Sequence, residues 1–149
     1  MAIDTVRESL LAQHDQIRRD LAVCHHLAAR LRSGELVAAE FDHALDRLCV
    51  DFDHHNCTET RLLLPLLLHG SHGRDTRGTR LAERMLEKHV AEHDAFRQRL
   101  EGPRDQVAAN LLELSEDLDA HMAAEERTFL NPTILRDDAR SLLAREDPL

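Results

Sequence analysis

The chain has 149 residues, which suits one domain with a single core, and we expect residues 1–149 to form that domain. A formal net charge of −9 leaves no dominant basic patch, so we do not expect nucleic acid as a partner. No apolar run approaches the ~20 residues that a membrane span needs, and the charged N-terminal segment lacks the apolar stretch of a secretory signal. We therefore expect a cytoplasmic protein without a membrane partner.

The composition favours an all-α fold, because the chain has only five Gly and four Pro and contains no Trp or Tyr. Apolar residues recur near the helical period of 3.6 from Val6 to Leu31, until Ser33-Gly34 ends the pattern. A second apolar stripe extends from Phe41 through Leu62 to Leu66, and we expect this helix to end between Pro65 and Gly70.

A polar loop at 69–79 separates these two helices from two more. The third stripe covers 81–100 and is ended by Gly102-Pro103, and the fourth covers 107–129. A shorter helical tail is expected at 137–145. Helices joined by short connections lie antiparallel, so the sequence predicts an up-down-up-down four-helix bundle with a short C-terminal helical tail.

The unusual feature of these helices is that titratable residues lie on their apolar stripes. The seven residues are His14, His55, Glu59, His89, His93, His121 and Glu125. The neighbouring His54 is rotated about 100° from His55 and is expected to point outwards. Three pairs have i,i+4 spacing, which lets two side chains share one metal ion: His55 with Glu59, His89 with His93, and His121 with Glu125.

The spacing also places these residues at matching heights in the bundle. His14 lies 20 residues before Gly34 and His55 lies 21 after it, so antiparallel helices bring the two side by side. The third turn is less balanced, because His121 is about nine residues further from it than His93, or roughly 14 Å of helix. We therefore expect the fourth helix to start late, or the segment from Gly102 to about Val107 to cross the end of the bundle.

One buried histidine is usually a core residue that hydrogen bonds to a neighbour, but seven titratable groups together indicate a metal site. Five imidazoles and two carboxylates exceed the four ligands of a structural zinc site and are unlike an all-oxygen calcium site. Two metal ions bridged by the carboxylates fit this set better. Imidazole with carboxylate suits iron, with manganese or zinc as substitutes.

Four segments in this order resemble the hemerythrin-like, or HHE cation-binding, domain family. They are H-D-Q-I from His14, H-N-C-T-E-T-R-L-L-L-P from His55, H-V-A-E-H from His89 and H-M-A-A-E-E from His121. The resemblance implies a four-helix bundle with a non-haem di-iron centre. It further implies that His89, His93 and His121 hold one iron and that His14 and His55 hold the other. Glu59 and Glu125 would bridge the irons beside an oxo or hydroxo group.

The last carboxylate departs from the oxygen-carrying hemerythrins, which have an aspartate five residues after the final histidine. Here Glu125 follows His121 at four residues and Glu126 at five. Glu125 shares the stripe of His121, so we expect it to be the ligand. Ferritin-like di-iron proteins use two Glu-x-x-His motifs, and Glu40-x-x-His43 is the single one here.

The sequence is compatible with three functions. The first is binding or sensing of oxygen, nitric oxide or peroxide at the metal pair. The second is an enzyme that consumes peroxide or nitric oxide, or an iron store or donor for repair of metal centres. The third is a metal-stabilised interaction module. Whether the protein is an enzyme, and whether it is a monomer or a dimer, is left open.

The remaining histidines and the cysteines are not expected to bind metal ions. The other histidines should be solvated: His25, His26, His43, His54, His69 and His72. The three cysteines, Cys24, Cys49 and Cys57, have no metal-binding spacing and are expected to be reduced thiols. Cys57 lies between two ligand candidates but about 200° around the helix from His55, so we expect it on the surface.

Overall fold

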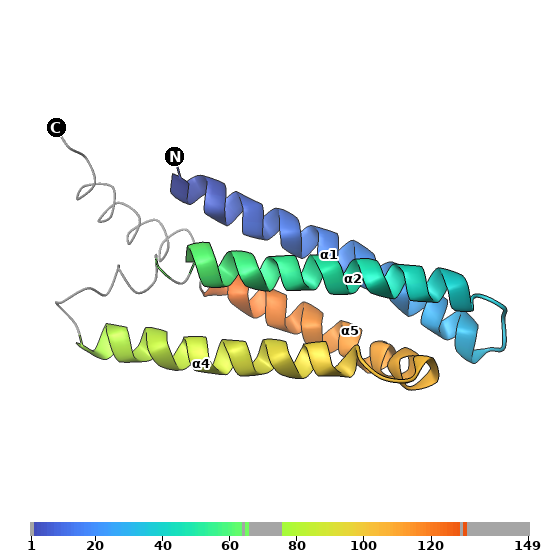
Figure 1. Cartoon of the computed structure of the whole chain (residues 1–149). Coiled ribbons are helices and arrows are strands. Elements are labelled where there is room, and N and C mark those ends of the chain that lie inside the picture. The colour runs from blue at the N-terminus through green and yellow to red at the C-terminus, as the bar shows by residue number, and fades with distance from the viewer. Residues whose placement is uncertain (1, 64, 66–75, 129, 131–149) are drawn as a thin grey trace.

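The computed structural model describes residues 2–63, 65, 76–128 and 130. In this part of the chain the secondary structure is entirely helical, with the bounds α1 Ala2–Arg32, α2 Ala38–Thr58, η1 Glu59–Leu63, α4 Thr76–Arg99 and α5 Arg104–Arg127. The four long helices lie side by side and neighbours in sequence run antiparallel (Figure 1). The predicted four-helix bundle is confirmed, whereas the predicted tail at 137–145 lies outside the described residues.

The turn between α1 and α2 forms where Ser33-Gly34 predicted it. The amide of Gly34 donates to the carbonyl of Leu31, and that of Glu35 donates to the carbonyl of Arg30. Gly34 has a φ of 90°, a conformation that is strained for residues with a Cβ. This pair of bonds satisfies the last carbonyls of α1 and reverses the chain, so α2 returns along α1.

The apolar core fills the bundle between the α1–α2 turn and the titratable residues. Its largest fully buried apolar side chains from α1, α2 and α5 are Ile17, Phe41, Leu48, Phe52, Leu111, Leu114, Leu118 and Met122. Phe52 also contacts the ring of His93 edge-on, with the ring centroids 5.6 Å apart. The core therefore continues up to the titratable cluster and excludes water from one side of it. Among the described helices, none is long and apolar enough to span a membrane.

The second helix departs from the predicted continuous α-helix at Glu59. There α2 passes into a π-helical turn, Glu59–Leu63, which holds more residues per turn than an α-helix. The extra residue moves the apolar stripe by one position, so Leu63 is 4% exposed and the predicted Leu62 is 48% exposed. Placing Leu62 on the inner stripe was therefore wrong, and Leu66 lies outside the described residues.

Two solutions were predicted for the height mismatch before His121. A late start of the fourth helix is wrong, because α5 begins at Arg104, directly after Pro103. The other solution was that the segment from Gly102 to about Val107 crosses the end of the bundle. The side-chain amide (Nδ2) of Asn110 donates to the backbone carbonyl of Arg99 at the end of α4, at 3.0 Å. The residues before Asn110 therefore extend beyond α4, and Arg104 reaches Asp42 on α2 at 2.6 Å. This overhang absorbs the extra residues before His121.

The third helix begins earlier than predicted, at Thr76, within the segment assigned to the 69–79 loop. Four of the remaining histidines are exposed as expected, namely His25, His26, His43 and His54, while His69 and His72 lie outside the described residues. The three cysteines form no disulfide, and Cys57 is exposed as predicted.

Candidate metal centre

The seven predicted residues come together inside the bundle, and each long helix contributes at least one of them from its inward face. His14 comes from α1, His55 from α2, Glu59 from the π-helical turn, His89 and His93 from α4, and His121 and Glu125 from α5. The i,i+4 spacing orients each helix's residues to the same side, which is why the cluster could be predicted from periodicity. His55 is 1% exposed, whereas His54 is exposed.

Glu125 lies at the centre of the cluster. Its Oε1 atom is 2.6 Å from Nε2 of His121 and 3.2 Å from Nε2 of His89. Its Oε2 atom is 3.0 Å from Nε2 of His14 and 3.7 Å from Nε2 of His55. The two oxygens of this one carboxylate therefore face two different sets of imidazole nitrogens.

Glu59 repeats this arrangement from the opposite side. Its Oε1 atom is 2.7 Å from Nε2 of His55, and its Oε2 atom contacts Nε2 of His89 and lies 3.7 Å from Nε2 of His93. The cluster thus divides into two groups that share a carboxylate. One consists of His89, His93, His121 and Glu125, and the other of His14, His55, Glu59 and Glu125. Within each group the candidate ligand atoms all lie within 4.8 Å of one another.

The cluster is incompletely satisfied by its own contacts. Nε2 of His55 and Oε1 of Glu59 are both buried, and although they lie 2.7 Å apart, neither makes a hydrogen bond of good geometry within the described part of the chain. Nε2 of His93 and Nε2 of His121 face each other at 2.9 Å, where at most one proton can lie between them. Each unsatisfied buried polar atom costs on the order of 1–3 kcal/mol. Cations bound by these nitrogen and oxygen atoms would satisfy them, so the residues fit a metal pair.

The pKa values of three cluster residues reflect how closely the imidazoles and carboxylates are packed. Burial raises the pKa of Glu125, but its interactions with the imidazoles of His121, His14, His55 and His93 hold the pKa far below its usual range, so the carboxylate is ionised. Burial lowers the pKa of His55, but interactions with Glu125 and Glu59 outweigh burial and raise it to about 9. Burial lowers the pKa of His93 and favours its neutral form. A metal ion would displace any proton held at these ring nitrogens.

A second set of residues holds the rings from outside, through the ring nitrogen that faces away from the cluster. Nδ1 of His55 pairs with Oε1 of Gln13 at 2.9 Å, and Nδ1 of His121 pairs with Oε2 of Glu92 at 2.8 Å. Such a partner fixes the ring orientation and leaves Nε2 as the donor to a metal. Gln13 and Glu92 could not be predicted from periodicity, because each lies beside an apolar stripe and pairs with a histidine on another helix.

Glu126 has the same outer role towards His14. Its Oε2 atom accepts a hydrogen bond from Nδ1 of His14 at 2.8 Å and lies 2.9 Å from Nη2 of Arg18. Glu126 is 28% exposed, compared with 3% for Glu125. The two adjacent glutamates are thus separated by the helical rotation between them: Glu125 faces the cluster, and Glu126 faces the outer side of one of its rings.

The family model for the hemerythrin HHE cation binding domain matches residues 5–133, a range that contains all seven residues of the cluster. No curated protein and no solved structure matches the chain significantly. The family match agrees with the helical bundle and with two adjacent His/Glu groups suited to a bridged metal pair. The chain therefore belongs to the hemerythrin HHE cation binding domain family.

Proposed function

We propose that this chain is a non-haem di-iron protein that binds or senses a small molecule such as oxygen, nitric oxide or peroxide. The observation that supports it most directly is the orientation of Glu59 and Glu125, each of which turns one oxygen to each histidine group. A carboxylate in this orientation can bridge two metal ions. Imidazole with carboxylate is a ligand set that suits iron, with manganese or zinc as substitutes.

In this proposal His89, His93 and His121 hold one ion, His14 and His55 hold the other, and Glu59 and Glu125 are shared. A bound iron pair supplies redox-active ions with a coordination position open to an external ligand. The outer partners Gln13, Glu92 and Glu126 keep the Nε2 atoms turned inwards. The buried ring of Phe52 and the apolar core keep water away from one side.

The proposal is tested by comparing alanine variants of two adjacent histidines, His54 and His55, with the wild type. The protein is loaded with iron under anaerobic conditions, reduced, and mixed with oxygen, nitric oxide or peroxide while its absorption spectrum is recorded. We expect wild type and His54→Ala to respond alike, because His54 is exposed, and His55→Ala to lose both the response and part of its iron.

Iron-loaded wild-type protein that responds to none of the three molecules would contradict the binding proposal and favour a metal-stabilised interaction module. Sustained turnover of peroxide or nitric oxide that is lost in His14→Ala would instead identify an enzyme.

A further inference from the structure

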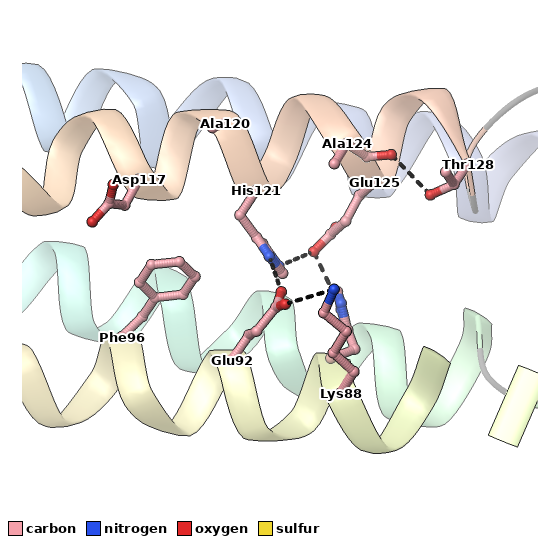
Figure 2. A pocket seen from close by; sticks show the side chains of 10 residues that line it. Lys88, Glu92, Phe96, Asp117, Ala120, His121, Ala124, Glu125 and Thr128 are labelled. Atoms are coloured by element: carbon pink, nitrogen blue, oxygen red, sulfur yellow. Dashed lines mark hydrogen bonds and ion pairs between the residues drawn. The ribbon is translucent and has the colours of Figure 1, made fainter. Parts of the chain in front are cut away.

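The two carboxylates that hold histidine rings from outside are themselves held in different ways. Glu92 lies at the pocket between α4 and α5, where its Oε2 pairs with Nδ1 of His121 (Figure 2). Its other oxygen lies 3.7 Å from Nζ of Lys88, a side chain that is 79% exposed. An exposed lysine pair at this distance contributes little, because water screens the charges and the long side chain stays mobile. Lys88 therefore holds Glu92 only weakly.

Glu126 is held by the guanidinium group of Arg18. Nη2 of Arg18 donates to Oε1 of Glu126 at 3.2 Å and lies 2.9 Å from its Oε2, the oxygen that pairs with His14. Nε of Arg18 donates to Oδ1 of Asp119, about two turns before Glu126 on α5, at 2.9 Å. The planar guanidinium, which is 32% exposed, thus reaches from α1 to two carboxylates of α5. This fork restricts the directions that both carboxylates can take.

The ring at the end of this chain of contacts is fully buried. His14 is 0% exposed, and its Nε2 lies 3.0 Å from Oε2 of Glu125 inside the cluster. An imidazole binds a metal ion through Nε2 when Nδ1 carries the hydrogen atom, and a partner at Nδ1 fixes both this tautomer and the direction of the ring. Glu126 is 28% exposed, so without Arg18 its side chain could turn towards water. The direction of the His14 ring therefore depends on Arg18.

We propose that Arg18 is a positioning residue for the metal ion held by His14 and His55, and that it acts through Glu126 on the direction of the His14 ring. This inference rests on the proposed function, because it presupposes a metal pair. His14 supplies one of two imidazoles in its group, whereas the other group has three. Misorientation of His14 therefore weakens the binding of one ion and leaves the imidazoles of the other ion in place.

The role of Arg18 is tested by titrating metal-free protein with Co2+, whose visible absorption reports coordination, in competition with a chelator. The binding step that is lost in His14→Ala identifies the ion of the two-histidine group. We expect Arg18→Gln to weaken that step by roughly three- to tenfold and to leave the other step unchanged, since loss of the outer partner itself typically costs about 10–100-fold. Lys88→Gln is the matched control. It removes the cation beside Glu92 and should change neither step.

A second readout needs no metal. In isotope-labelled metal-free protein, the hydrogen atom on Nδ1 of His14 should exchange slowly with water and give a resolved NMR signal. Arg18→Gln should speed this exchange, Lys88→Gln should not, and Arg18→Lys should restore slow exchange in part, because an ammonium group can still pair with Glu126.

Co2+ affinities in Arg18→Gln that equal those of wild type, or that are weakened equally at both steps, would overturn the positioning role while leaving the metal pair intact. Wild type that binds fewer than two Co2+ ions would contradict the proposed function instead. The exchange rate at His14 then decides the role of Arg18 alone: faster exchange in Arg18→Gln supports it, and an unchanged rate overturns it.

Discussion

The carboxylate of Glu126 accepts a hydrogen bond from Nδ1 of His14, on the opposite side of the ring from the Nε2 atom that faces Glu125. Two adjacent glutamates thus contact the same imidazole at its two nitrogens. We expect Glu125→Gln to abolish the pair, because it removes a shared ligand. Glu126→Gln should retain both metals but weaken binding by roughly 10–100-fold, as is typical for loss of an outer partner. Metal titration of the two variants distinguishes these roles, and equal effects would refute the assignment.

Because of the π-helical turn, alanine substitutions at the adjacent Leu62 and Leu63 should differ in their effect on stability. Leu63 is buried and Leu62 is about half exposed, so Leu63→Ala should lower the free energy of unfolding by about 2–4 kcal/mol. Leu62→Ala should change it by roughly 0.5 kcal/mol or less. Urea denaturation of both variants measures the difference. The reverse order would indicate that α2 continues as a regular α-helix through this region.

Asp20, which is not one of the candidate metal ligands, should make the stability of the fold depend on pH. It is 7% exposed, and its Oδ1 accepts a hydrogen bond from Gln16, while Oδ2 makes no hydrogen bond of good geometry to the residues that the structure describes. Burial raises its pKa from 3.8 to about 6, and the neighbouring carboxyl of Asp51 raises the pKa as well. The folded state therefore binds this proton more tightly than the unfolded state. Stability should be lost as the pH rises from about 4 through about 6.

Asp20→Asn cannot lose this proton, so its stability relative to wild type should increase over the same pH range. The gain at pH 7.5 should be on the order of 1–2 kcal/mol. Thermal melts from pH 4 to 8 measure it, with Asp46→Asn as a control at an exposed position of α2. Parallel curves for wild type and Asp20→Asn would show that the buried carboxyl does not govern this dependence.

Periodicity was sufficient to predict the bundle and the inward placement of the seven cluster residues, because both follow from which face of a helix is apolar. It could not predict the shift from Leu62 to Leu63, since a π-helical turn depends on local backbone hydrogen bonding. Nor could it predict outer partners such as Gln13 and Glu92. Those features arise from contacts between helices, which the pattern within one helix does not contain.

We propose that the two His/Glu groups hold a pair of metal ions and that iron is the native metal. The most direct measurement is the amount of iron, manganese and zinc per chain, by plasma mass spectrometry, in protein purified without added metal. We expect about two ions per chain, mostly iron, because each of the two groups offers four ligand residues to one ion and imidazole with carboxylate suits iron. Glu125→Gln, which removes the shared carboxylate, should lower that value. Well under one metal ion per chain in a fully helical wild-type protein would contradict the metal pair.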